Sequence, residues 1–368
     1  MIHTITTPSL LLDKARCMDN IERMVAKATA NQVGLRPHFK THQSLEIGRW
    51  FRECGVQRIT VSSLRMAAHF AQDGWDDITV AFPVNFLELD RINQLASQIQ
   101  LNLVVENREA LQALEKGLSH SVHVFIKADT GYHRTGLSPH AFDQVDQLIE
   151  SIQQCSKLTL KGFLAHAGHS YKAKGKSAVL KVHEESLLQF QLFRLRYQDS
   201  FPNLIYSAGD TPTCSVANTF PGVDELRPGN FVFYDLSQWQ IGSCALDQIA
   251  VAMACPVVAK HYDRNEIVVY GGGVHFSKDR VQLANGEIIY GMLVQPQGNS
   301  WVIPEMVTPV RSLSQEHGII RGDQALLDTF SIGELAYILP VHSCMTADLM
   351  KRYLVSDGSV IDDVLRLV

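Results

Sequence analysis

The chain has 368 residues, of which 46% are hydrophobic and 19% charged, a composition typical of globular proteins and not of disordered or fibrous ones. This length exceeds the size at which single cores stop growing, so we expect a large domain with a smaller companion. The net charge of −5 argues against a nucleic-acid-binding surface, and no apolar run approaches the roughly 20 residues that cross a bilayer. We therefore expect a cytoplasmic protein that binds a small molecule, with neither nucleic acid nor a membrane as partner.

Between residues 20 and 237, β-rich runs alternate with amphipathic stretches, which is typical of βα units around a parallel sheet. Eight units favour a (β/α)8 TIM barrel over a doubly wound sheet, which usually has fewer strands. The expected strands are residues 34–40, 57–62, 77–82, 100–105, 121–129, 158–165, 203–207 and 223–226. The expected helices are residues 44–54, 64–73, 86–97, 108–116, 139–154 and 179–194.

Residues 238–368 show β-branched runs separated by turn residues, without intervening helices. This pattern predicts a second, mainly antiparallel β domain, which we expect residues 1–19 to join through a strand at 9–12. Its other expected strands are residues 249–260, 266–270, 301–310, 334–339 and 352–355.

The first candidate segment, 36–42 (RPHFKTH), ends the first barrel strand. Side chains alternate along a strand, so His38, Lys40 and His42 are expected on one face. Burial and cationic neighbours lower a lysine's pKa and give the neutral amine that Schiff-base chemistry needs. The alternative is a strand-end lysine that reaches solvent.

The loop after the fifth strand, 127–136 (KADTGYHRTG), contains two glycines that permit a tight turn. Arg134 lies between them, and its guanidinium suits a phenolate or carboxylate. The alternative is an arginine in a surface ion pair.

The sixth strand ends in 166–171 (HAGHSY), which supplies acid–base groups and an aromatic ring. The seventh and eighth strands end in 207–213 (SAGDTPT) and 227–234 (RPGNFVFY). Backbone N–H groups at a helix start bind phosphate, and barrels recurrently place a phosphate site on these last two loops. We therefore expect Thr211, Gly229 and Asn230 to bind a phosphate group.

The last candidate segment, 340–344 (PVHSC), is expected to be extended, with His342 and Cys344 on the same face. Zn²⁺ favours an imidazole with a thiolate, and two protein ligands leave positions for water and substrate. The alternative is a core histidine beside a buried cysteine. The seven cysteines include no CxxC pair, which is consistent with reduced thiols.

These segments, together with 7–13 (TPSLLLD) and 316–318 (EHG), resemble the D-serine dehydratase and D-threonine aldolase family. Its members are fold-type III pyridoxal-phosphate enzymes with an alanine-racemase-like barrel, and the resemblance covers nearly the whole chain. It implies that Lys40 is the Schiff-base lysine and that Arg134 lies near the cofactor's phenolic oxygen. It also implies a set of further cofactor-binding residues: Tyr171, Thr211, Gly229 and Asn230.

The resemblance further implies that His342 and Cys344 are metal ligands, as in zinc-dependent D-serine dehydratases. Many aldolase members look more like a histidine–aspartate pair, which suits harder Mn²⁺ or Mg²⁺. Two positions depart from the family pattern. Leu164 stands where some dehydratase-like members have tyrosine, and Asp210 stands where glycine or serine is more usual.

The implied function is β-elimination from a D-β-hydroxy amino acid, in which Lys40 removes the Cα proton. D-Serine would then give pyruvate and ammonia. One alternative is retro-aldol cleavage to glycine and an aldehyde, with His38 or His169 as the base. Others are an amino-acid racemase, a non-catalytic pyridoxal-phosphate carrier and a barrel without cofactor. The resemblance also implies a homodimer.

Overall fold

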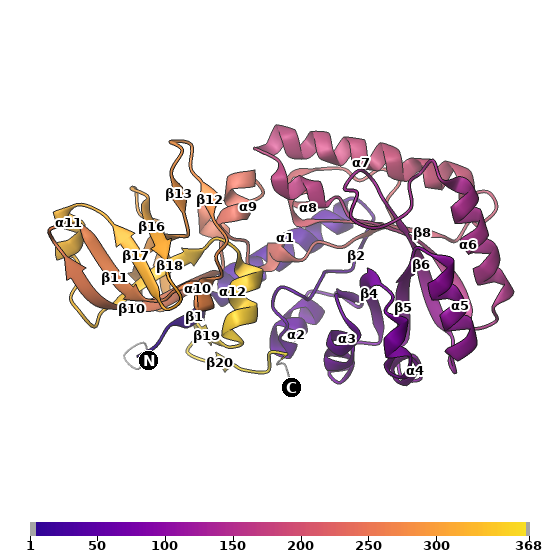
Figure 1. The fold of residues 1–368 in the computed structure, drawn as a ribbon, viewed down its shortest axis with the longest axis horizontal. Coiled ribbons are helices and arrows are strands. Elements are labelled where there is room, and N and C mark those ends of the chain that lie inside the picture. Colours follow the sequence, from indigo (N-terminus) through magenta and orange to yellow (C-terminus); the bar gives the residue numbers. More distant parts are fainter. Residues whose placement is uncertain (1–4, 366–368) are drawn as a thin grey trace. The chain divides into compact units, whose positions relative to one another are not determined.

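The computed structural model describes residues 5–365, which form two compact units (Figure 1). The barrel unit comprises Glu22–Lys40 and Ile47–Gly229. The β unit comprises 5–21, Thr41–Glu46 and 230–365. Residues 1–4 and 366–368, which belong to the predicted β domain, lie outside the described range.

The barrel unit is built on eight parallel strands in the order β2-β9-β8-β7-β6-β5-β4-β3. A bridge between His38 and Thr60 joins the segment after β2 to β3, which closes the ring. The predicted (β/α)8 barrel is therefore confirmed. The strands are β2 (Gly34–Leu35), β3 (Ile59–Val61), β4 (Asp77–Pro83), β5 (Gln100–Val105), β6 (Val122–Ala128), β7 (Leu158–Ala165), β8 (Ile205–Ala208) and β9 (Glu225–Leu226).

Helices lie on the outside of these strands (Figure 1). Local capping sets several of their starts: the Ser63 side chain accepts a hydrogen bond from Met66 N, and that of Asn107 accepts one from Ala110 N. The helices are α2 (Leu45–Glu53), α3 (Leu64–Ala71), η2 (Phe86–Glu88), α4 (Leu89–Ala96), α5 (Arg108–Gly117), α6 (Phe142–Gln154), η3 (Gly168–Lys172), α7 (Lys176–Tyr197) and α8 (Thr211–Val216).

One long helix, α1 (Lys14–Ala30), was not predicted. Its sequence nevertheless carries a helical signal, because Cys17, Ile21, Met24 and Ala28 recur at intervals of three or four residues and are all buried.

The β unit contains a ring of antiparallel strands in the order β10-β18-β14-β16-β17-β11, closed by pairing of β11 with β10. β1 pairs antiparallel with β10, so the N-terminal strand joins this sheet as predicted. The strands are β1 (Ser9–Leu12), β10 (Val251–His261), β11 (Glu266–Tyr270), β12 (Val281–Gln282), β13 (Ile288–Ile289), β14 (Gly291–Gln297), β15 (Ser300–Val302), β16 (Thr308–Leu313), β17 (His317–Arg321), β18 (Leu335–Pro340), β19 (Tyr353–Val355) and β20 (Val360–Ile361).

Two features of the β unit differ from the prediction. The single strand expected at 301–310 is two strands, β15 and β16, because Pro304 in the connecting segment has no N–H to donate to a ladder. Short helices also occur, although none was expected after residue 237. The helices that lie wholly after residue 237 are η5 (Leu246–Gln248), α10 (Gly273–Phe276), α11 (Gln324–Asp328) and α12 (Ser343–Met350). Two more lie at the start of the β unit, η4 (Asn230–Val232) and α9 (Leu236–Ile241).

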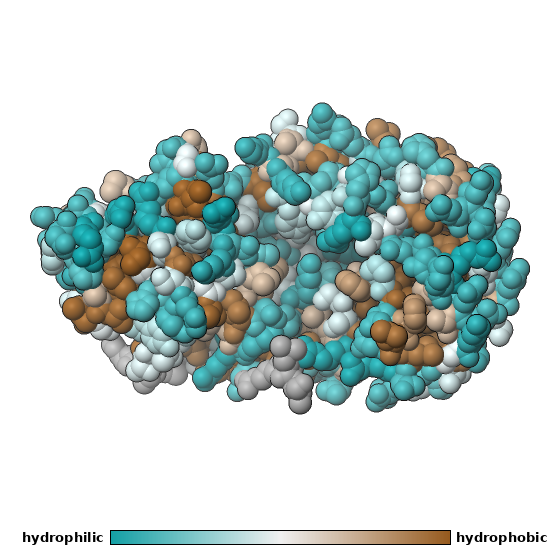
Figure 2. All heavy atoms as spheres, viewed as in Figure 1, coloured by the Kyte–Doolittle hydropathy of each residue, from teal (hydrophilic) through white to brown (hydrophobic). Residues whose placement is uncertain are grey.

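The outer face of each unit is mixed in character. Figure 2 shows hydrophobic residues in scattered patches among hydrophilic ones. Within residues 5–365, none of the helices combines the length and the apolar character that a bilayer crossing requires.

Candidate functional site

The segment 36–42 is not the extended strand that we predicted. β2 ends at Leu35, and residues 39–42 form turns, so alternation with period two does not extend to His42. Lys40 is exposed, and its backbone N lies 3.4 Å from His38 Nδ1. His42 is buried and belongs to the β unit, where its Nδ1 lies 3.1 Å from Ser44 N. His38 and Lys40 thus remain together on the barrel unit, without His42.

Aromatic packing fixes the position of Lys40. Phe39 is fully buried, and its ring centroid lies 5.0 Å from Phe51, 4.9 Å from Phe70 and 5.2 Å from Trp75. Such edge and tilted contacts hold a ring firmly. The residue before Lys40 is therefore anchored while Lys40 itself reaches outward.

The loop after β6 is organised by one carboxylate. Asp129 Oδ1 accepts hydrogen bonds of 3.0 Å from the backbone N–H groups of Gly131, Tyr132 and His133. Burial alone would raise the pKa of Asp129, but the hydrogen bonds from His133 and Gly131 lower it below its ordinary value. Gly131 has a φ of 106°, as expected of a tight loop. This turn carries Arg134, whose guanidinium lies 4.9 Å from the ring centroid of Tyr132.

Tyr132 also contacts both histidines of the loop after β7. Its ring stacks on His169 at 6.1 Å and meets His166 edge-on at 6.1 Å. Burial lowers the pKa of His166 to about 3, so its Nδ1–H donates to the Gly209 carbonyl at 2.9 Å and its Nε2 is unprotonated. Burial lowers the pKa of His169 as well. Both imidazoles are therefore neutral near pH 7.

Two buried basic residues, Lys127 and Arg227, were not identified from the sequence. Lys127 Nζ donates to the carbonyls of Ala128 and Leu164, at 3.3 Å each. Burial and then the positive charges of Arg227 and Arg134 lower the pKa of Lys127 to about 7. Arg227 is also buried, and it donates to Ser207 Oγ and to the Ala165 carbonyl. Both residues lie in the quoted segments, but a sequence does not reveal which cations turn inward.

Two of the predicted phosphate-binding residues, Thr211 and Gly229, lie together with Tyr171, which was predicted to bind the cofactor. Thr211 N donates to the Tyr171 hydroxyl at 3.3 Å, and Gly229 N donates to Thr211 Oγ1 at 3.3 Å. Both N–H groups thus point at hydroxyl oxygens. A phosphate oxygen could accept hydrogen bonds from the same donors. The side chain of Asn230 lies elsewhere, within the β unit, where it donates to Asp235 Oδ2 at 2.7 Å.

The His342–Cys344 pair is not extended either. β18 ends at Pro340, His342 is the N-cap residue of α12, and Cys344 lies in the first turn of that helix. The two side chains nevertheless lie near enough for Cys344 to affect the pKa of His342. Burial alone would lower the pKa of His342, but the hydrogen bond to Cys344 and the negative charge of the thiolate raise it to about 10.

Polar groups surround this pair. His342 Nδ1 lies 2.9 Å from Asp279 Oδ2, which leaves Nε2 on the other side of the ring. Cys344 Sγ lies 3.2 Å from Thr41 Oγ1 and 3.3 Å from Asn230 Nδ2. A metal-bound imidazole usually donates its second N–H to a carboxylate, as His342 does to Asp279.

Asp235 holds the segment between His342 and Cys344 by hydrogen bonds to Ser343. Its Oδ2 accepts from the backbone N of Ser343 at 3.0 Å and from Ser343 Oγ at 3.2 Å. Its Oδ1 accepts from Gln238 N at 2.9 Å, which caps α9. Across residues 5–365, no three or more His, Cys, Asp or Glu side chains gather as a metal-binding group. A metal bound at this place would thus have two protein ligands at most, the nitrogen of His342 and the sulfur of Cys344.

Comparison with known proteins adds to this geometry. Residues 12–237 match the alanine racemase N-terminal domain, and residues 250–356 match the serine dehydratase domain. The D-threo-3-hydroxyaspartate dehydratase of Delftia sp. (strain HT23) is 32% identical, over 97% of this chain and 96% of its own. The D-serine dehydratase of Dictyostelium discoideum is 28% identical, over 98% and 96%.

The solved structure of the Delftia dehydratase is similar to this one, with a TM-score of 0.88 at 29% identity, over 97% of this chain and 96% of that one. The same enzyme has also been solved as a cysteine-to-alanine mutant in a metal-free form.

Proposed function

The chain belongs to the family that joins an alanine racemase N-terminal domain to a serine dehydratase domain, and on this basis we propose that it is a lyase of D-β-hydroxy amino acids dependent on pyridoxal phosphate and a metal. The proposed reaction is the dehydration of D-serine to pyruvate and ammonia. The observation that carries the proposal is the His342–Cys344 pair with the Asp279 carboxylate behind the imidazole. A racemase or a cofactor carrier has no need for such a pair.

The barrel unit offers the residues that would hold pyridoxal phosphate. Lys40 is assigned to the Schiff base and Arg134 to the phenolic oxygen, while the donors around Thr211 would take the phosphate. When bound, this cofactor supplies the electron sink that stabilises a carbanion at the substrate Cα. Lys40 Nζ is assigned to removal of the Cα proton.

The β unit offers the metal ligands. His342 Nε2 and Cys344 Sγ would hold Zn²⁺, with Mn²⁺ or Mg²⁺ as alternatives. When bound, the ion supplies Lewis acidity that makes a β-hydroxyl a better leaving group. The residues around the pair serve to orient it: Asp279 fixes the imidazole, while Thr41 and Asn230 can each donate to the thiolate.

Retro-aldol cleavage is the second candidate. It needs a neutral base for the β-hydroxyl proton, and burial keeps His169 neutral beside Tyr132. His38, whose Nδ1 accepts from Lys40 N, is the other proposed base. In this reaction the Cα–Cβ bond breaks and ammonia is not released.

Product analysis separates the two candidates. We propose that the holoenzyme be incubated separately with D-serine, D-threo-3-hydroxyaspartate and D-threonine, with assays for ammonia, keto acid and glycine. Dehydration predicts equal amounts of ammonia and keto acid from D-serine. Glycine and an aldehyde from D-threonine, without ammonia, would replace the dehydratase proposal with the aldolase one.

The proposed enzyme is a homodimer, as the family resemblance implies. Sedimentation at micromolar protein would show one species of twice the chain mass. A fully active monomer would remove this part of the proposal.

A further inference from the structure

Asp210 is a buried carboxylate to which the proposed function gives no role. It is 2% exposed and is the N-cap residue of α8. Its Oδ1 accepts from Thr213 N at 2.8 Å, and its Oδ2 accepts from Thr213 Oγ1 at 2.8 Å. These two contacts are sufficient to cap a helix start.

A third contact goes beyond capping. Oδ1 also accepts from Ser170 Oγ at 2.7 Å, and Ser170 is itself fully buried. Ser170 belongs to η3 and lies between His169 and Tyr171 in the chain. Asp210 therefore ties the loop after β7 to the start of α8.

The two segments that Asp210 ties together carry Tyr171, which is assigned to the cofactor, and Thr211, which is assigned to its phosphate. Tyr171 follows Ser170, Thr211 follows Asp210, and Thr211 N donates to the Tyr171 hydroxyl. Each assigned group is thus one residue away from one end of the Ser170–Asp210 hydrogen bond. A shift of either segment would separate them.

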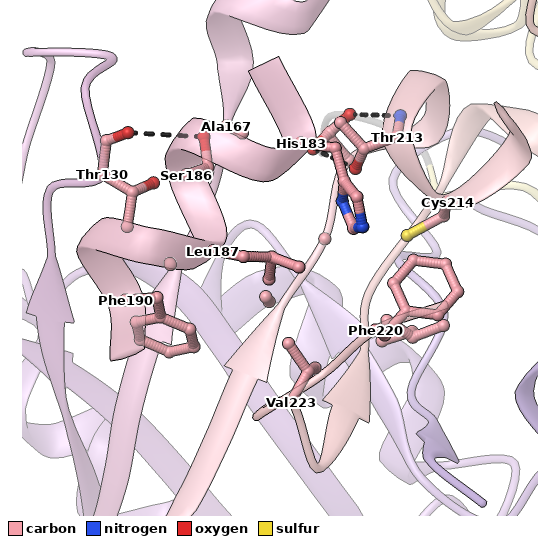
Figure 3. Close-up of a pocket in the computed structure, with 15 residues that line it drawn as sticks. Thr130, Ala167, His183, Ser186, Leu187, Phe190, Thr213, Cys214, Phe220 and Val223 are labelled. Carbon is pink, nitrogen blue, oxygen red and sulfur yellow. Dashed lines mark hydrogen bonds between the residues drawn. The ribbon is translucent and has the colours of Figure 1, made fainter. Parts of the chain in front are cut away.

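α8 borders a small cavity of the barrel unit. A small cavity lies against α8 and is lined by Thr213 and Cys214 of that helix, by Phe190 of α7 and by Asp210 (Figure 3). Thr213 and Cys214 are nevertheless buried, so α8 is packed on its other sides. The hydrogen bonds from Thr213 to Asp210 fix where this packed helix starts.

The oxygens of Asp210 are engaged by hydrogen bonds from two residues. Ser170 Oγ and Thr213 N donate to Oδ1, and Thr213 Oγ1 donates to Oδ2. Burial raises the pKa of Asp210 to about 6, although the hydrogen bonds from Ser170 and Thr213 oppose that rise. The carboxylate thus sits next to the phosphate-binding groups in the chain while its oxygens are engaged elsewhere.

We propose that Asp210 is a positioning residue, which through Ser170 holds Tyr171 and Thr211 at the separation that the phosphate group of pyridoxal phosphate requires. This inference rests on the proposed function, and it gives a role to Asp210 at a position where glycine or serine is more usual in the family. If Asp210 only capped α8, Ser170 would be dispensable for cofactor binding.

The test compares two ligands on protein freed of cofactor. Ser170→Ala removes the tie and leaves both capping contacts in place. The lost hydrogen bond is one to a charged group, so we expect roughly tenfold or greater weakening of pyridoxal phosphate binding. Binding of pyridoxal, which has no phosphate, should stay within about twofold of wild type, and the ³¹P resonance of bound cofactor should shift.

Two further variants complete the set. Asp210→Asn keeps an oxygen that can accept from Ser170 and Thr213 N, so it should restore most of the affinity that Asp210→Ala loses. Asp323→Ala is the matched control, because Asp323 caps α11 by accepting from Leu326 N at 2.9 Å. This control should bind pyridoxal phosphate as wild type does.

The outcomes are distinguishable. Wild-type protein that does not bind pyridoxal phosphate would overturn the proposed function and this inference with it. Wild-type binding with an unchanged Ser170→Ala variant would overturn the inference alone. Equal loss of pyridoxal and pyridoxal phosphate binding would also overturn it, because the lesion would then be general.

Discussion

Asp210 of the barrel unit and Asp235 of the β unit hold their surroundings in the same way. Each is a buried N-cap residue of a six-residue helix, and each also accepts the hydroxyl of a serine from another segment, Ser170 or Ser343. What they support differs. Asp210 supports the segment whose donors are assigned to the phosphate. Asp235 supports the segment that carries the two proposed metal ligands, His342 and Cys344.

This difference has consequences for function. A phosphate group bound by several N–H and hydroxyl donors should tolerate the loss of one, with graded weakening. A metal ion with two protein ligands should be lost when either ligand is lost. A mutation should therefore be able to impair cofactor binding and leave metal binding unchanged, or the reverse.

Lys40→Ala should have the largest effect. Lys40 is assigned both the covalent attachment of the cofactor and the proton removal, so its loss should abolish the visible absorbance of bound cofactor and bring turnover below detection. Metal content, measured by atomic emission, should stay at the wild-type level. A yellow, active variant would refute the assignment of Lys40.

Asp235→Ala should weaken metal binding without affecting cofactor. Removal of groups that orient metal ligands typically costs 10–100-fold in metal affinity, and we expect a loss in that range. Competition with a chromogenic chelator measures the affinity, and Asp323→Ala serves as the control for loss of a cap. If Asp235→Ala instead weakened pyridoxal phosphate binding, the separation of the two regions would be wrong.

Arg134→Ala should keep cofactor but reduce turnover of D-serine by roughly tenfold, which is the scale of one hydrogen bond to a charged group. Arg134→Lys should recover only part of this rate, since an ammonium lacks the planar fork of a guanidinium. The measurement is kcat together with cofactor occupancy. A wild-type rate in Arg134→Ala would return Arg134 to the surface ion-pair alternative.

Lys127 should have no effect on either binding step and should instead affect stability. Its pKa of about 7 in the fold is below its ordinary value of 10.5, so the unfolded chain binds more protons between these limits. Between pH 7 and 10, Lys127 should therefore make the free energy of unfolding rise with pH by at most about 1.4 kcal/mol per pH unit, opposite in sign to the contribution of His342, whose pKa is raised. Lys127→Met should remove that rise in urea titrations. An unchanged slope would contradict the burial of Lys127 as a neutral amine.

The sequence predicts the barrel unit well because its signals are local. Alternating strands and helices, with glycines and capping residues between them, identify each βα unit without knowledge of its neighbours. The same reasoning selected Arg134 and Thr211 as candidates, since chemistry in a barrel lies on the loops after strands. α1 was missed although its buried residues follow a helical period.

Where strands end proved harder to predict. Side-chain alternation predicts an extended chain past Leu35 and past Pro340. Instead, β2 ends at Leu35 and turns follow, while α12 begins at Ser343, soon after Pro340. His42 and Lys40 consequently separate, while His342 and Cys344 still meet. The supporting residues Asp235 and Asp279 are distant in sequence from the pair, so no local pattern could have indicated them.

The central claim is that His342 and Cys344 hold a removable metal that elimination requires. The most direct test is extensive chelation of the holoenzyme, followed by measurement of D-serine turnover, visible absorbance and thermal unfolding. We predict that turnover is lost, that cofactor absorbance and the unfolding temperature are retained, and that added Zn²⁺ restores activity. Metal-free protein that turns over D-serine at the untreated rate would contradict the claim and leave His342 and Cys344 as a structural pair.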